Sequence, residues 1–175
     1  MDIKKCFSKQ TGFTMTELLV VMAIISILTT AVLISYRNSN RNYSLDQATH
    51  QLVSNLRKIQ NMALSGVETS GYDSYGLYVL DNTNSYILYI DTNNNNTYQP
   101  SDTIFETINL QNNIVVDSTT PLSNKLDIFF KSPDPITYIN GSNSIGVLGT
   151  IVLNVDGLSK TKTITVNTAG LIQGN

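Results

Sequence analysis

A stretch of twelve residues carries oxygen atoms at a spacing that suits a hard cation. Its donors stand at loop positions 1, 3, 5, 7, 9 and 12: Asp91, Asn93, Asn95, Thr97, Gln99 and Asp102. Position 7 offers its backbone carbonyl and the others offer side chains, which is the register in which twelve-residue loops surround calcium. Calcium is therefore the one cofactor that the sequence suggests.

Two features of this stretch argue against calcium. An EF-hand loop has glycine at position 6, where this chain has Asn96, although asparagine tolerates a positive φ better than most residues. The flanking sequence is typical of strands rather than helices. Because the stretch ends in Asp102 rather than glutamate, it is also similar to the loops of dockerins. The alternative is an asparagine-rich hairpin loop without a metal, and both interpretations stay open.

Few residues in the chain suit other chemistry. Its one cysteine is Cys6 and its one histidine is His50, which argues against a disulfide, a histidine triad and a multi-histidine metal site. His50 is most simply a solvated helix residue. The sequence has no phosphate-binding loop and no nucleophile elbow, so we predict that the protein is not an enzyme. A net charge of -2 gives no attraction to nucleic acid.

A carboxylate stands inside an apolar segment near the N-terminus. Phe13 to Tyr36 is long enough to cross a bilayer, which takes about 20 apolar residues, and Glu17 is its only charge. A secretory signal peptide is the alternative, but its apolar region is usually about 7–15 residues long, and Thr29-Thr30-Ala31 is a poor cleavage site. We therefore predict a membrane-spanning helix.

The charges around this segment bear on its orientation and on Glu17. Lys4, Lys5 and Lys9 precede it, which favours a cytoplasmic N-terminus. Ionisable residues inside a span are candidates for function. The alternative is that Glu17 lies at the membrane interface without a role, and the physical argument alone leaves that open.

The helix is expected to continue beyond the span. An apolar stripe recurs at helical period: Leu45, Ala48, Leu52, Leu56, Ile59 and Ala63. Such a stripe predicts one face packed on a core. Asn38-Ser39-Asn40 and Asn42 are positions at which the helix could be interrupted, and Gly66 is the expected stop.

After Gly66 the pattern changes to strands. They are expected at 75–80, 86–90, 103–110, 114–116, 125–130, 144–155 and 160–167. Turns are expected at Asp81–Asn84 and Asp156-Gly157, and a loop at Pro133–Pro135. The predicted fold class is α+β, with one long N-terminal helix whose second half packs on an antiparallel β domain.

The segment from Gly12 to Val21 reads GFTMTELLVV and follows a short basic leader. It closely resembles the type III signal of type IV pilins and type II secretion pseudopilins. The resemblance implies that a prepilin peptidase cuts between Gly12 and Phe13 and methylates the new amine of Phe13. It also implies that Glu17 neutralises this amine on a neighbouring subunit and so acts in filament assembly.

The same resemblance divides the chain and places it in the cell. The expected parts are a cleaved leader (1–12), a transmembrane helix (13–36), an amphipathic helix (37–66) and a β-rich globular domain (67–175). The protein would cross the inner membrane once, with a cytoplasmic leader, and then enter an extracytoplasmic filament. Its expected partners are other pilin or pseudopilin subunits, the prepilin peptidase and an inner-membrane assembly platform.

Two further segments, QLVSNLRKIQNMALSG and TKTITVNTAGLIQ, are similar to the GspH/FimT group of minor pseudopilins and minor pilins. Many major pilins have a kinking proline where this chain has Ile34, which favours a minor component. The expected function is a structural subunit of a type II secretion pseudopilus or a type IV pilus. The alternative is a pilus-tip binding subunit for adhesion or DNA uptake, although Lys160 and Lys162 are the only cations near the tail.

Overall fold

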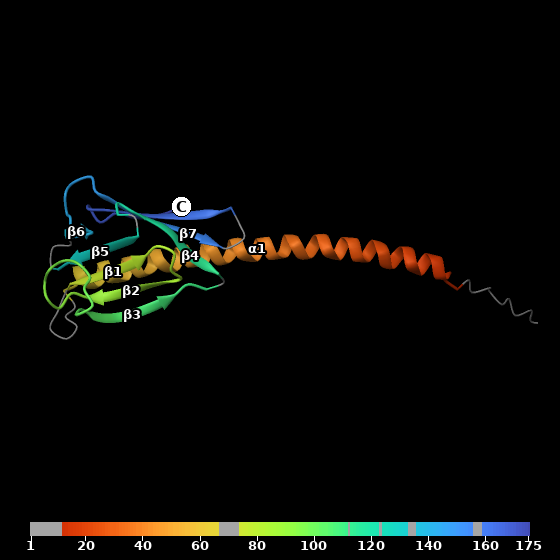
Figure 1. Cartoon of the computed structure of the whole chain (residues 1–175), viewed down its shortest axis with the longest axis horizontal. Coiled ribbons are helices and arrows are strands. Elements are labelled where there is room, and N and C mark those ends of the chain that lie inside the picture. Colours follow the sequence, from red (N-terminus) through yellow and green to blue (C-terminus); the bar gives the residue numbers. More distant parts are fainter. Residues whose placement is uncertain (1–11, 67–73, 112, 123, 133–135, 156–158) are drawn as a thin grey trace, which may run out of the picture. The chain divides into compact units, whose positions relative to one another are not determined.

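The computed structural model describes the chain in six ranges: 12–66, 74–111, 113–122, 124–132, 136–155 and 159–175. By its internal contacts the chain divides into two compact units, Met1–Ser39 and Asn40–Asn175. Within the described ranges, one helix is followed along the chain by nine strands (Figure 1). This confirms the α+β fold class, with one long N-terminal helix and antiparallel sheets.

Helix α1 spans Met15–Leu64, a length of 50 residues. The asparagines between residues 38 and 42 do not interrupt it. In the first unit its large apolar side chains are exposed, Leu19, Ile27 and Leu33 among them. By length and composition this helix is able to cross a membrane.

The part of α1 that belongs to the second unit buries one face. All six residues of the predicted apolar stripe are buried, as the helical period required. The helix ends near Gly66, which has a φ of 57° and whose N–H donates to the carbonyl of Ala63 at 3.2 Å. Glycine adopts this left-handed conformation without steric cost, which confirms the predicted stop.

The strands form two antiparallel sheets. The five-stranded sheet has the order β3-β2-β1-β5-β6 and the four-stranded sheet the order β4-β7-β8-β9. The strands of the first sheet are β1 (Tyr75–Leu80), β2 (Ser85–Ile90), β3 (Thr103–Asn109), β5 (Lys125–Lys131) and β6 (Ile136–Ile139). Those of the second are β4 (Ile114–Thr120), β7 (Leu148–Val155), β8 (Thr161–Asn167) and β9 (Ile172–Gly174).

Strand register sorts the side chains of the five-stranded sheet onto two faces. Tyr75, Leu77 and Val79 of β1 are buried and belong to the main core, together with the α1 stripe and residues of both sheets. Because side chains alternate along a strand, Gly76 and Tyr78 lie on the opposite side, which we call the outer face. Tyr89, the register partner of Gly76, and Asp127, the partner of Tyr78, lie on it too.

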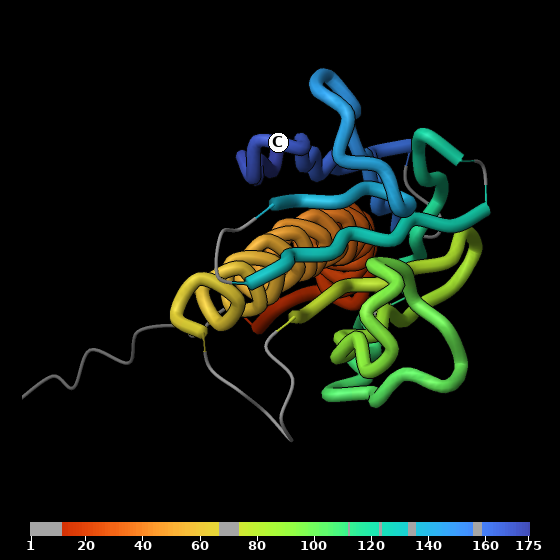
Figure 2. The backbone as a smooth tube through the Cα atoms, turned by 90° about the vertical axis from the view of Figure 1, so that its left-hand side faces the viewer, coloured from red at the N-terminus to blue at the C-terminus, as the bar shows by residue number. Residues whose placement is uncertain are grey.

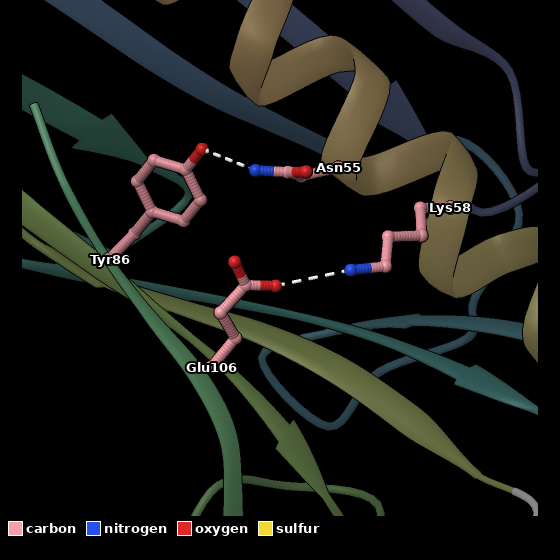
Figure 3. A network of polar contacts seen from close by, with 4 residues as sticks. All are labelled: Asn55, Lys58, Tyr86 and Glu106. Atoms are coloured by element: carbon pink, nitrogen blue, oxygen red, sulfur yellow. Dashed lines mark hydrogen bonds and ion pairs between the residues drawn. The ribbon is translucent and has the colours of Figure 1, made fainter.

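The second half of α1 contacts both sheets. On one side, Asn55 donates to the Tyr86 hydroxyl at 2.8 Å, and Lys58 pairs with Glu106 of β3 at 3.1 Å (Figure 3). On another side, Gln60 donates to the carbonyl of Gly170, before β9, at 2.8 Å. A view along the helix shows strands on more than one side of it (Figure 2). The core of the second unit therefore lies between this helix and two sheets.

Several strands differ from the expected bounds. The segment expected at 144–155 begins as a strand only at Leu148, because Gly146 has a φ of 90° and Val147 closes a turn back to Ser144. Strand β4 extends to Thr120 beyond a register shift that follows Val116. The short strands β6 and β9 were not predicted. The turn expected at 156–157 and the loop expected at 133–135 lie outside the described residues.

Candidate functional site

The expected cleavage point lies just before the first turn of α1. Gly12, Phe13 and Thr14 precede the helix, and Phe13 is 84% exposed. A Cβ atom added at Gly12 would meet no atom within 4 Å. The bond between Gly12 and Phe13 thus lies in non-helical, exposed backbone and is accessible to an endopeptidase.

Glu17 occupies the first turn of α1, where it has a local role as well. The N–H of Glu17 donates to Thr14 Oγ1 at 3.2 Å, so Thr14 caps the helix. Threonine followed three residues later by glutamate is the spacing of a capping box, and an acid in the first turn also interacts favourably with the helix dipole. The sequence interpretation missed this role, although the T-x-x-E spacing was visible. Helix capping and filament assembly are therefore two separate explanations of why a glutamate stands at position 17.

Three hydroxyl side chains of the apolar helical segment form hydrogen bonds within the helix. Ser26, Thr29 and Thr30 each donate to the backbone carbonyl four residues earlier, at 2.8, 2.7 and 2.9 Å. A polar group without a partner is costly in lipid, and these bonds remove that cost. The segment is therefore compatible with a lipid environment despite its hydroxyl groups.

A second candidate site is the loop from Asp91 to Asp102, which connects β2 and β3. Both terminal aspartates are buried, with 0% and 6% of their surface exposed. Asp91 accepts hydrogen bonds from the backbone N–H groups of Asn93, at 3.2 Å, and Asn96, at 2.9 Å. Asp102 accepts from the N–H of Gln99 at 2.7 Å and from the N–H and the hydroxyl of Thr92, both at 3.3 Å. The two carboxylates thus organise the loop from its two ends.

Asparagine side chains and backbone conformation complete the loop. Asn93 Oδ1 accepts from the N–H of Asn95 at 3.1 Å, and Asn95 Oδ1 accepts from the N–H of Thr97 at 2.9 Å. Asn94 and Asn96 have positive φ values of 57° and 62°. Asn96, at the position where a calcium loop has glycine, therefore adopts the backbone conformation that glycine favours.

The loop folds back on the outer face of the five-stranded sheet. Tyr98 stacks on Tyr78 of β1, with ring centroids 4.4 Å apart, and meets the edge of Tyr89 of β2 at 5.1 Å. The Tyr89 ring lies directly over Gly76, whose position leaves no space for a Cβ atom. The loop is therefore a packed element rather than a solvated hairpin connection.

Asp127 of β5 joins the loop to the sheet. One carboxylate oxygen accepts from the Tyr89 hydroxyl and the other from the N–H of Tyr98, both at 2.7 Å. Burial raises the pKa of Asp127 to about 6, the two hydrogen bonds oppose that rise, and the charges of Asp102 and Asp91 add to it. Burial and the negative charge of Asp127 also raise the pKa of Tyr89. The sequence interpretation missed Asp127, whose only signal was a lone acid in the apolar strand KLDIFFK.

The structure brings the predicted metal-site residues, Asp91, Asn93, Asn95, Thr97 and Asp102, into one ordered loop. Across the described ranges, no group of three or more histidine, cysteine, aspartate or glutamate side chains is placed to hold a metal ion. A cation at this loop would thus depend on amide and carbonyl oxygens in addition to carboxylates. His50 is exposed on α1, and Cys6 lies outside the described residues.

Comparison with known proteins gives one match, at the N-terminus. Residues 7–33 match the family described as the prokaryotic N-terminal methylation motif. Neither the curated proteins nor the solved structures contain a significant match. The motif is of the prepilin type, and it supports a type IV pilin-like precursor that is processed by a prepilin peptidase and assembles with other pilins. It also suggests a structural subunit rather than an enzyme, and with the apolar helix it fits a single-pass anchor in the inner membrane.

Proposed function

We propose that this protein is a minor pilin or pseudopilin, a structural subunit of a type IV pilus or of a type II secretion pseudopilus. The observation that carries the proposal is the methylation motif at residues 7–33, which runs into the apolar start of α1. The resemblance of two further segments to the GspH/FimT group, and the absence of proline from α1, support a minor subunit.

In this function the leader is removed and Glu17 acts in assembly. Cleavage after Gly12 leaves a positively charged amine on Phe13, and methylation keeps that charge. A carboxylate surrounded by lipid is costly, and an opposite charge offsets the cost. Contact between Glu17 of one subunit and the Phe13 amine of a neighbour therefore favours the filament over subunits dispersed in the bilayer. The inner-membrane assembly platform would be the place where a subunit moves from the bilayer into the filament.

Glu17→Gln and Thr14→Ala separate assembly from helix capping. Glutamine at position 17 keeps the side-chain shape and the capping-box type but removes the charge. Alanine at position 14 removes the cap, at a cost of about 1 kcal/mol of helix stability, and leaves the charge. Each variant is expressed in place of the wild-type protein, and its amounts in the membrane and in sheared filaments are measured along with cleavage.

We expect Glu17→Gln to be inserted and cleaved like the wild-type protein but to be depleted from the filament fraction. Thr14→Ala should enter filaments at close to the wild-type level. Normal entry of Glu17→Gln, together with poor entry of Thr14→Ala, would mean that Glu17 serves the helix end and not the contact between subunits.

A further inference from the structure

Three buried carboxylates gather at the outer face of the five-stranded sheet. Asp91, Asp102 and Asp127 are 0%, 6% and 5% exposed. They come from different places in the chain, since Asp127 belongs to β5 and the other two end the loop between β2 and β3. Asp127 contacts the loop directly, because its carboxylate accepts from the N–H of Tyr98 at 2.7 Å. Burial of negative charge is costly without a compensating positive charge.

Within the described ranges, none of these three carboxylates forms an ion pair with a lysine or arginine. The ion pairs found there join Lys58 to Glu106 and Lys162 to Asp46. The three buried aspartates are held instead by N–H and O–H donors, which are neutral dipoles. The site thus has a surplus of negative charge that a bound cation would offset.

The loop presents oxygen atoms that already have fixed orientations. Each oxygen of Asp91 uses one lone pair on a backbone N–H, and a carboxylate oxygen has a further lone pair to offer. The amide oxygen of Asn93 is held by the N–H of Asn95, and that of Asn95 is held by both the N–H and the hydroxyl of Thr97. Donors fixed before binding need little further ordering when a ligand arrives.

Asn96 supplies a separate sign that the polar groups of the loop are not all satisfied. Its Oδ1 atom is buried and has no hydrogen-bond partner in the described part of the chain. A buried acceptor without a partner is destabilising. Water or a hydrated ion at the loop would remove that cost.

We propose that the loop from Asp91 to Asp102 is a calcium site. The ligands would be Asp91, Asn93, Asn95 and Asp102 through their side chains and Thr97 through its carbonyl, in the register described above. Asp127, which accepts from the N–H of Tyr98 in the loop, would attract the ion through its charge without being one of the ligands. This inference is independent of the proposed filament function.

The composition of the site sets its affinity and selectivity. Two carboxylates and several neutral oxygens predict weak binding, with a Kd on the order of 10⁻⁴–10⁻³ M, as in extracellular calcium modules. Such a site would fill outside the cytoplasm, where calcium is abundant. Magnesium should bind poorly, because it requires a smaller octahedral shell than a twelve-residue loop provides.

Calcium binding is measured on the full chain purified in detergent micelles. Protein freed of metal with a chelator is titrated with calcium chloride by calorimetry, and its thermal unfolding is followed in calcium, in magnesium and in chelator. At a calcium concentration of ten times Kd, Tm should rise by about 3–6 °C, and magnesium should leave Tm unchanged.

Terbium gives a second, local measurement. The chain contains nine tyrosines and no tryptophan, and Tyr98 lies inside the loop, stacked on Tyr78. Terbium is a chemical substitute for calcium that emits when an aromatic ring close to it is excited. We expect tyrosine-sensitised emission that calcium displaces and magnesium does not.

Three variants identify the site. Asn93→Ala changes an exposed ligand with little effect on folding, and Asp91→Asn removes a buried ligand charge. Asp117→Asn makes the same charge change on an exposed position of β4 and is the matched control. We expect Asn93→Ala and Asp91→Asn to lower calcium affinity at least tenfold and Asp117→Asn to leave it unchanged. Absence of a calcium-dependent Tm shift and of terbium emission in the wild-type protein, or equal effects of all three variants, would overturn the proposal.

Discussion

The pKa of the Asp127 carboxyl is set by the groups that surround it. Its carboxylate is 5% exposed on the outer face, between the Tyr89 hydroxyl and the N–H of Tyr98, with Asp91 and Asp102 on the facing loop. The pKa of about 6 means that the folded protein holds this proton more tightly than the unfolded chain, whose aspartates titrate near 3.8. Stability must therefore fall as the pH rises through the interval between these two values.

The pH prediction concerns protein kept free of calcium by chelator. Between pH 4 and pH 7 the contribution of Asp127 should lower the free energy of unfolding by up to about 3 kcal/mol. Asp127→Asn removes the titration, and its amide group is able both to donate to the Tyr89 hydroxyl and to accept from the N–H of Tyr98. Denaturant unfolding of the two proteins at each pH should show that the wild-type protein loses stability relative to Asp127→Asn as the pH rises from 4 to 7. If the stabilities of the two proteins changed with pH in parallel, the raised pKa of Asp127 would be contradicted.

At the scale of elements, the outer face depends on a close approach between two strands. Gly76 of β1 leaves room for the Tyr89 ring of β2, and that ring is held by Asp127 and by contacts with Tyr98 and Phe129. A ring fixed on several sides does not move aside readily. The site where the loop packs therefore requires glycine at position 76.

Gly76→Ala should lower the free energy of unfolding by about 1–3 kcal/mol, because the added methyl group displaces Tyr89. Gly149→Ala is the control, since its Cβ would lie 3.3 Å from the flexible side chain of Leu126. We expect a smaller loss there. Chemical denaturation of both variants tests the difference, and an equal loss would show that the Tyr89 ring is free to move.

Local pattern predicted some of these elements and not others. The stripe from Leu45 to Ala63 has a helical period over many turns, and all of it is buried as expected. Strands β6 and β9 have four and three residues, too few for alternation to be visible. The contact of Tyr98 with Tyr78 and Asp127 depends on strand register and on the path of a loop, which no local pattern contains. The ligand spacing in the loop was visible, and its packing on the outer face was not.

At the scale of the whole molecule, the chain combines two compact units of different chemistry. The unit up to Ser39 exposes an apolar helical surface, and the unit from Asn40 buries its own core between a helix and two sheets. Bilayer or neighbouring subunits are environments in which the first surface would be favourable. The methylation motif and the capped start of α1 both belong to the first unit. The proposed filament function thus rests on the first unit, and the proposed calcium site belongs to the second.

The central claim is that this chain is a precursor whose mature form begins at Phe13. The most direct test is the intact mass and the N-terminal peptide of the protein isolated from cells with an active prepilin peptidase. The account predicts loss of residues 1–12 and the addition of one methyl group at the amine of Phe13, with both changes blocked when Gly12 is substituted. A protein from such cells that still begins at Met1 would contradict the account.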